Sequence, residues 1–237
     1  MQDIEILVAL HKPYSLPTET IYVPILVGNT KIPGMENALR DNTGQNISKK
    51  NPYYCEMTAL YWAWKNLDTR YLGIVHYRRY FAGKHFALHK EQRIATRTEI
   101  EAALAKAPVI VPRKRNYWIE TTYSQYAHAH HGKDLDSVRQ ILSVQYPEYL
   151  ESFDLVMGRT KGHRFNMVIM RRDLLDSYCT WLFDLLFQME SRIDIQSYDS
   201  YNQRVYGFLA ERLLDVWIEA NHVPYTETVS YTHLTLP

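Results

Sequence analysis

The sequence has few of the features that mark disulfide-rich or nucleic-acid-binding proteins. Only two of its 237 residues are cysteines, Cys55 and Cys179, and they lie far apart. We therefore expect free buried thiols in a reducing cytoplasm rather than a disulfide framework. The formal net charge is +1, from 27 basic and 26 acidic residues. This balance gives no indication of a basic nucleic-acid footprint, and we expect no nucleic-acid partner.

Long apolar runs are also lacking. No run approaches the roughly 20 residues that a membrane-spanning helix needs. The start, Met1-Gln2-Asp3-Ile4, has no basic stretch followed by an apolar one, so we expect no signal peptide. These absences predict a cytoplasmic protein, at most in peripheral contact with the inner face of the membrane.

Hydrophobic residues are abundant, at 46%, and 19 tyrosines and 5 tryptophans stand out. Aromatic rings of this kind line sugar-binding sites as well as cores, and composition leaves both roles open. The length fits a single domain, which we place at residues 1–228. Residues 229–237 resemble the translation of a transposon-end sequencing adapter, so we expect a non-native tail there. A natural exposed tail is the alternative.

The hydrophobic pattern alternates between short apolar runs and amphipathic stretches. We expect a helix opened by Pro52, a short helix from Thr98 with Glu101 in a capping box, and a long loop over 29–51. The remaining expected elements are strands at 4–10, 22–27, 71–76, 108–112 and 165–170, and helices within 121–149, 172–190 and 201–221. This order predicts an α/β fold with a Rossmann-like sheet, mixed in its second half, and a helical C-terminal layer.

Polar side chains follow two of the expected strands directly. His11 and Lys12 come after the first strand, and the run from His76 to Arg79 ends the third. Ligands of α/β sheets bind beyond the carboxyl ends of the strands, and the 29–51 loop should fold over the same edge. The sequence therefore predicts a binding site at this edge of the sheet.

Three segments resemble one protein family: His11-Lys12-Pro13-Tyr14, the stretch from Leu39-Arg40-Asp41-Asn42 to Asn51-Pro52-Tyr53-Tyr54-Cys55-Glu56, and Gly73-Ile74-Val75-His76-Tyr77-Arg78-Arg79-Tyr80-Phe81. Phe165-Asn166-Met167 and the run from Arg204 to Leu214 also match. This resembles a bacterial family long catalogued as a domain of unknown function, found in capsular and exopolysaccharide gene clusters. The resemblance covers residues 4–221 and implies a GT-A-like glycosyltransferase. Some members are associated with galactofuranose transfer.

The resemblance implies a nucleotide diphosphate sugar donor, which we expect to be UDP-linked. The acceptor would be a surface polysaccharide or a lipid-linked oligosaccharide. Many GT-A enzymes hold a metal with an Asp-x-Asp motif after a strand, but His76, Tyr77 and Arg78 occupy that position here. Guanidinium groups bind phosphate oxygens instead of cations, so we predict metal-independent catalysis by Arg78 or Arg79. A divalent cation remains open, as do purely structural salt bridges of the two arginines.

Other residues are predicted to bind the donor and the acceptor. The expected donor-binding residues are His11, Lys12, Asp41, Asn42, Asn46, His76 and Tyr77. The polar residues of the loop supply donors and acceptors for a base and ribose, or they hold turns together. Glu56 could bind or could favour its helix start electrostatically. His128, His130 and His131 suggest a zinc site, but no matching cysteine or carboxylate motif supplies its remaining ligands. His131 is instead the predicted contact to the acceptor.

An inverting transferase needs a base for the acceptor hydroxyl. Asp199 and Glu211 are the predicted catalytic carboxylates and Asp194 is a further candidate, whereas a retaining mechanism needs none. The apolar residues of the last helices, Trp181 and Trp217 among them, should pack on the sheet, with contact to a lipid-linked acceptor as the alternative. A non-catalytic carbohydrate- or nucleotide-binding module is the competing function. A glycoside hydrolase ranks last, because no carboxylate pair stands out near the strand ends.

Overall fold

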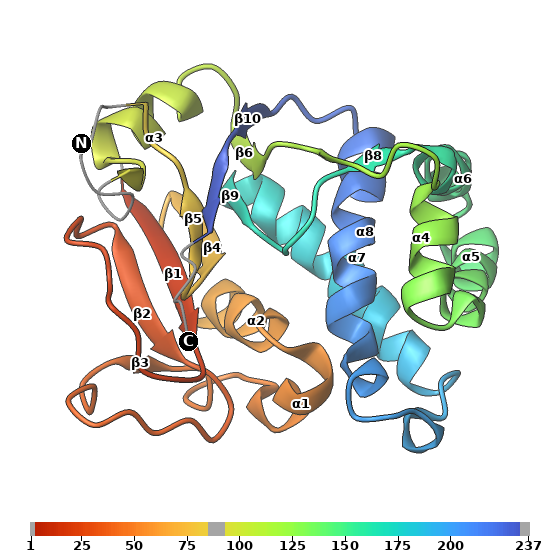
Figure 1. Cartoon of the computed structure of the whole chain (residues 1–237), viewed down its shortest axis with the longest axis horizontal. Coiled ribbons are helices and arrows are strands. Elements are labelled where there is room, and N and C mark those ends of the chain that lie inside the picture. Colours follow the sequence, from red (N-terminus) through yellow and green to blue (C-terminus); the bar gives the residue numbers. More distant parts are fainter. Residues whose placement is uncertain (1–2, 85–92, 233–237) are drawn as a thin grey trace.

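The computed structural model describes residues 3–84 and 93–232. Nine strands of the described residues form one sheet (Figure 1). Seven of them lie in the order β10-β6-β9-β4-β1-β2-β3, while β5 pairs with β4 and β11. Their bounds are β1 Ile4–Leu10, β2 Tyr22–Leu26, β3 Leu39–Arg40, β4 Tyr71–His76, β5 Arg79–Phe81, β6 Val109–Pro112, β9 Val168–Arg171, β10 Thr226–Thr228 and β11 Ser230–Thr232.

The strand directions follow the expected mixed pattern. Strands β3, β2, β1 and β4 are parallel, and Ala9 of β1 is in register with His76 of β4. Strand β9 runs antiparallel to both β4 and β6. Because β6 and β4 therefore share one direction, their carboxyl ends lie at the same edge of the sheet. The sheet is thus parallel in its first half and mixed in its second.

The sheet is covered on both faces, which explains the nearly continuous apolar runs of its central strands. Leu7 and Ala9 of β1 pack in one core with α2 (Met57–Asn66), α7 (Arg172–Glu190) and α8 (Val205–Ala220). Ile6 and Val8 pack in the other core with α3 (Arg97–Leu104). Figure 1 shows α3 on the opposite side of the sheet from α7 and α8. The outer helices are α4 Thr122–Ala129, α5 Gly132–Gln145 and α6 Leu150–Gly158.

Several expected elements differ from the structure in detail. The helix expected from Pro52 to Asn66 is split into α1 (Asn51–Tyr54) and α2, because Cys55 adopts a φ of 52°. The capping box of α3 is formed by Thr96 and Glu99, not by Thr98 and Glu101. The strand expected from residue 165 begins at Val168, since the two residues before Met167 have positive φ.

The end of the chain also differs from expectation. The last helix begins at Val205, after a 3-10 turn over Asn202–Arg204. Residues 230–232 pair as β11 with β5, and residues 233–237 of the expected tail lie outside the described part. Trp181 and Trp217 are 5% and 1% exposed, so these two side chains pack in the core as expected and are not available for lipid contact. None of the described helices has the length and apolar character needed to span a membrane.

Candidate functional site

The site is built where the strand order reverses. Moving from β1, the sheet continues through β2 and β3 on one side and through β4 on the other. His11 follows the carboxyl end of β1, and Tyr77 follows that of the neighbouring β4. Such a switch point leaves a crevice between the connections that leave the two strands, and ligands bind there in open α/β sheets.

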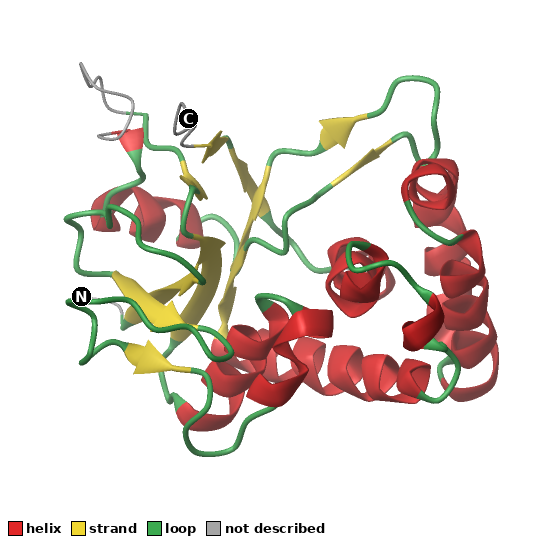
Figure 2. Cartoon of the chain, turned by 60° about the horizontal axis from the view of Figure 1, so that its bottom comes forward, coloured by secondary structure: helices red, strands yellow, loops and turns green. Residues whose placement is uncertain are grey.

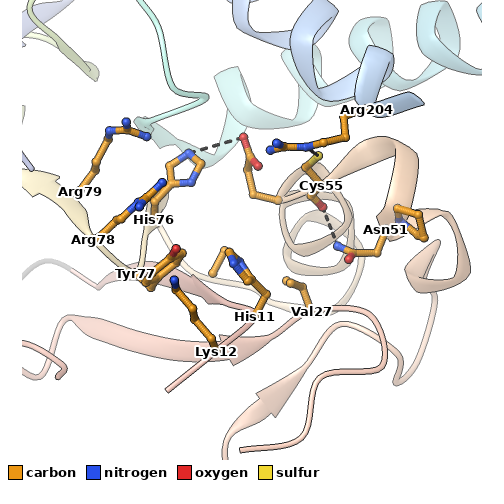
Figure 3. Close-up of a pocket in the computed structure, with 13 residues that line it drawn as sticks. His11, Lys12, Val27, Asn51, Cys55, His76, Tyr77, Arg78, Arg79 and Arg204 are labelled. Atoms are coloured by element: carbon orange, nitrogen blue, oxygen red, sulfur yellow. Dashed lines mark hydrogen bonds and ion pairs between the residues drawn. The ribbon is translucent and has the colours of Figure 1, made fainter. Parts of the chain in front are cut away.

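A cavity of about 600 Å³ occupies this crevice (Figure 3). This volume lies within the range of natural small-molecule sites. Six of the predicted site residues line it together: His11, Lys12, His76, Tyr77, Arg78 and Arg79. The other lining residues are Ala9, Val27, Asn51, Pro52, Cys55, Glu56 and Arg204.

The cavity wall is strongly cationic. Lys12, Arg78, Arg79 and Arg204 are four basic residues of the wall, whereas Glu56 is the single carboxylate among the described lining residues. Within the described ranges, no carboxylate forms an ion pair with Lys12 or Arg78, whose charges instead lie 5.4 and 5.5 Å from the centre of the Tyr77 ring. Unpaired cations around a concave surface raise the local concentration of anions.

Arg79 shows the unused capacity of the wall most directly. Its guanidinium lies 4.2 Å from the centre of the Phe165 ring, and its Nε is buried without a hydrogen-bond partner. Burial, and then the neighbouring charge of Arg78, lower the pKa of Arg79. The alternative in which Arg78 and Arg79 form structural salt bridges is therefore wrong for the described part of the chain.

His11 experiences the same field. Burial lowers the pKa of His11, and the charges of Lys12, Arg204 and Arg78 lower it further. The imidazole is therefore neutral at neutral pH. A neutral ring can still accept or donate a hydrogen bond at the cavity wall.

A strained turn before β9 organises one side of the site. Phe165 and Asn166 have φ values of 78° and 49°, which cost free energy in residues other than glycine. The carbonyl of Phe165 accepts a 2.5 Å hydrogen bond from His76 Nε2, so the proton of that ring lies on Nε2. The Asn166 amide donates to Glu56 Oε1 at 2.6 Å. The turn thus positions three groups: the Phe165 ring beneath Arg79, the His76 imidazole and the Glu56 carboxylate.

The helical layer contributes Arg204, which the sequence had singled out only as part of a matching motif. Arg204 Nε donates to Cys55 Sγ at 3.1 Å, across the break between α1 and α2 (Figure 3). Burial raises the pKa of the Cys55 thiol to about 11, so this thiol stays protonated at neutral pH. The contact orients the guanidinium at the cavity without neutralising it.

Asp41 does not lie in the cavity, and its predicted role in donor binding is wrong. Its side chain is fully buried. The carboxylate accepts hydrogen bonds from Gly28 N at 2.9 Å and from the hydroxyls of Ser48 and Thr58 at 2.5 Å each. With its oxygens occupied in this way, Asp41 holds the 29–51 loop against β2 and α2.

Asn42 and Asn46 are exposed and lie outside the cavity lining. The Asn46 amide donates to the carbonyls of Thr43 and Gly44, and its Oδ1 accepts from Ser48 N. Asn46 therefore holds the turn together, as the alternative interpretation of this loop predicted. The structure brings neither asparagine to the site.

The remaining predicted residues do not line the cavity. The His131 ring packs against the Tyr198 ring in a tilted arrangement, with ring centres 4.1 Å apart. Asp199 is exposed, and its carboxylate accepts from Tyr201 N and from the Asn202 side chain. These bonds, first that from Asn202, lower the pKa of Asp199, which makes it a poor base. Glu211 accepts a hydrogen bond from Arg212 at 3.0 Å.

The lining residues do not fit a divalent cation of the Asp-x-Asp type. His76 ends β4, and Tyr77 and Arg78 follow it in place of carboxylates. Glu56 is the only acidic residue among the described residues that line the cavity. Among the residues that the structure describes, no group of three or more histidines, cysteines or carboxylates is placed to hold a metal. The three histidines at 128–131 accordingly form no such group.

The whole chain resembles a solved structure described as the apo form of the bifunctional glycosyltransferase WbbM. The match covers 99% of this chain at 26% identity and a TM-score of 0.88. It confirms the expected GT-A-like fold. The chain covers 46% of WbbM, so it spans less than half of that protein's length.

A second solved structure, the mannosyltransferase Ktr4p from S. cerevisiae, matches at 11% identity over 95% of this chain and 67% of that chain. Its TM-score of 0.34 is too low to support a shared fold. No curated protein matches the sequence significantly. A family described as a domain of unknown function, DUF4422, matches residues 5–222, and the chain belongs to that family.

Proposed function

We propose that this chain is a glycosyltransferase that moves a sugar from a nucleotide diphosphate sugar to a glycan acceptor. The observation that carries the proposal is the set of cations in the cavity at the switch point that have no carboxylate partner among the described residues. The match to WbbM, which is described as a bifunctional glycosyltransferase, supports the same class of reaction.

In this reaction the bond between the anomeric carbon and the diphosphate oxygen breaks. The electron pair stays on the diphosphate, whose negative charge grows in the transition state. Guanidinium groups can hold two phosphate oxygens at once, and Arg79 has a buried Nε donor that no described residue accepts from. We assign the stabilisation of the leaving diphosphate to Arg78 and Arg79, with Lys12 and Arg204 adding to the field. The same assignment makes a divalent cation unnecessary.

The new bond forms between the anomeric carbon and an acceptor hydroxyl, which loses its proton. Glu56 takes over the role that the sequence assigned to Asp199 or Glu211, because it is the carboxylate in the cavity wall. Its side chain is 10% exposed, and Asn166 holds one of its oxygens. A carboxylate fixed in this way can accept the hydroxyl proton in an inverting reaction.

The finer identity of the substrates follows from the family resemblance. The proposed donor is UDP-linked, with galactofuranose as the transferred hexose. The proposed acceptor is a surface polysaccharide or a lipid-linked oligosaccharide. Tyr77, His11 and Lys12 form the side of the cavity beside β1, where the nucleotide would lie.

The release of nucleoside diphosphate, measured with a panel of nucleotide sugars and oligosaccharide acceptors, tests the proposal. Turnover should require the acceptor and should persist in the presence of a chelator. Arg78→Ala should reduce it by about 10²-fold or more, the usual loss when one transition-state donor is removed. Donor binding without turnover for any acceptor would indicate a binding module instead. Loss of turnover on chelation would refute the arginine mechanism alone.

A further inference from the structure

A loop outside the cavity lining exposes two large apolar side chains. Trp118 is 81% exposed and Ile119 is 94% exposed. They lie between β7 (Arg115–Asn116) and α4. Soluble surfaces rarely present a tryptophan and an isoleucine side by side at this level of exposure, and such pairs mark interaction sites.

The loop is held in this form by its backbone. Tyr117 N donates to Thr160 O at 2.9 Å and Thr122 N donates to Arg159 O at 2.7 Å, which fixes both ends. Trp118 has a φ of 62°, a conformation that is costly for a residue other than glycine, and its N–H donates to Asn116 Oδ1. A strained backbone that turns an indole toward solvent is maintained against its cost, which points to a function.

Exposed basic residues lie on the two strands next to this loop and just before them. Strand β7 pairs with β8 (Lys161–Gly162), and these two strands with residues 117–121 form what we call the arm. Figure 2 shows the two short strands of the arm running out from the large sheet. Arg113, Arg115 and Lys161 are exposed, and no carboxylate of the described residues pairs with them. The one acidic residue of the arm, Glu120, is engaged by His128.

The arm starts from the edge of the sheet that carries the cavity. Arg113 follows the carboxyl end of β6, which lies at the same edge as the end of β4. On the return path, Gly162 of β8 leads within a few residues to Phe165, beneath Arg79. A surface bound by the arm would therefore lie on the side of the sheet where the site opens.

We propose that the arm binds a membrane surface that carries anionic lipid headgroups. Tryptophan prefers the boundary between headgroups and acyl chains, and Ile119 adds apolar area that a lipid interior accepts. The unpaired cations match the phosphates of the headgroups. A glycan stacking on Trp118 would leave Ile119 and these cations without a partner. The link to catalysis, delivery of a lipid-linked acceptor, rests on the proposed function.

Co-sedimentation with vesicles of phosphatidylcholine and phosphatidylglycerol tests this inference on the full chain. The wild type should bind these vesicles and should bind vesicles of phosphatidylcholine alone much more weakly. The double variant Trp118→Ser/Ile119→Ser should lose about tenfold or more in affinity. Arg115→Glu/Lys161→Glu should lose affinity for the anionic vesicles and should weaken its dependence on salt.

Val144→Ser is the matched control, since Val144 is 72% exposed on α5, away from the arm. It should bind vesicles as the wild type does. Failure of the wild type to bind anionic vesicles overturns the inference, as does full binding by the Trp118→Ser/Ile119→Ser variant. A dimer that this variant dissociates, or a loss of affinity for soluble glycan alone, would assign the arm to those partners and overturn it as well.

Vesicle binding does not depend on catalysis, so the two proposals fail separately. Turnover with a soluble acceptor should be unchanged in both arm variants. Wild-type protein that binds vesicles but never releases nucleoside diphosphate would refute the proposed function and leave the arm's role intact.

Discussion

Arg172 and Arg79 are both partly buried, yet their surroundings differ in kind. Arg172 donates to the carbonyls of Leu67 and Trp64 at 2.7 and 2.8 Å, and its Nε lies 3.0 Å from Asp176. Arg79 has a buried Nε that makes no hydrogen bond. A desolvated, unpaired cation costs stability, so its presence calls for a ligand that compensates it. Arg172 therefore stabilises the fold, whereas the unpaired Nε of Arg79 indicates a bound anion as its partner.

Alanine variants of Arg79 and Arg172 should differ sharply in activity and in stability. Arg79→Ala should reduce kcat/KM by about 10²- to 10³-fold, because it removes a donor aimed at the leaving diphosphate. It should change the melting temperature little, since no side-chain hydrogen bond to the described residues is lost and only the contact with the Phe165 ring disappears. Arg172→Ala should instead destabilise the protein by about 2 kcal/mol, because charged hydrogen bonds to the end of α2 disappear. Steady-state kinetics and thermal unfolding of both variants provide the measurement.

Exchanged phenotypes of the two variants would contradict these roles of Arg79 and Arg172. A destabilised Arg79→Ala protein with normal kcat/KM would assign Arg79 to the fold. Arg78→Ala is the matched neighbour, since Arg78 lines the same cavity and lies over the Tyr77 ring. It should follow Arg79→Ala in kinetics and in stability.

A second contrast lies within the 29–51 loop. Asp41 is buried and accepts three hydrogen bonds, whereas Asn42 beside it is exposed. Asp41→Ala should destabilise the protein by about 3 kcal/mol, because it leaves buried donors without an acceptor. Asn42→Ala should change stability by less than about 0.5 kcal/mol. Denaturant unfolding measures both effects. The dissociation constant of the donor should be the same for Asp41→Ala and the wild type, because Asp41 does not line the cavity.

The general form of the fold was predictable because it depends on local pattern. Apolar runs such as Ile4–Leu10 and Tyr71–His76 identify strands buried on both faces, and the residues that follow them identify the edge of the site. The breaks at Cys55 and Phe165 were not predictable. Neither residue favours positive φ, so the conformation is imposed by tertiary contacts such as those of Arg204 and Asn166.

The site was predictable where its residues follow strands and not where distant segments meet. His11 and Arg78 come directly after β1 and β4, so sequence order alone places them together. Asp41 appears as polar as its neighbours in the sequence, and only packing distinguishes a buried carboxylate from an exposed one. Arg204 reaches the cavity from the start of α8, through a contact with a residue 149 positions away. A basic residue in a matching motif was its only signal.

Cys55 tests whether the contacts of the wall serve chemistry or orientation. Because burial raises the pKa of its thiol to about 11, the side chain stays protonated and is no nucleophile at neutral pH. Cys55→Ser keeps a hydrogen-bond acceptor for Arg204, and it should lower kcat/KM by no more than about tenfold, since one neutral hydrogen bond contributes about 1 kcal/mol. Arg204→Ala should lower it more. Complete inactivity of Cys55→Ser with an unchanged melting temperature would give the thiol a direct role.

His11 should make a small contribution to the stability of the protein that depends on pH. Burial, and then the charges of Lys12, Arg204, Arg78 and His76, lower the pKa of His11 below its usual 6.5. Above about pH 7 the ring is neutral in both the folded and unfolded chains and contributes no difference. As the pH falls through 6.5 the unfolded chain takes up the proton first, so stability is lost until the lower folded pKa is reached.

The melting temperature of the wild type should therefore fall more between about pH 7.5 and about pH 5.5 than that of His11→Gln, which has no titrating ring there. An anion in the cavity offsets the positive charges that add to burial in lowering the pKa of His11. Saturating inorganic pyrophosphate should thus raise the pKa of His11 and reduce the difference between the two proteins. Equal slopes without the anion would mean that neither burial nor the cationic wall lowers the pKa of His11. If pyrophosphate leaves the difference between the two proteins unchanged, the anion binds elsewhere than beside this ring. The charges that act on His11 would then be distinct from those that bind the diphosphate.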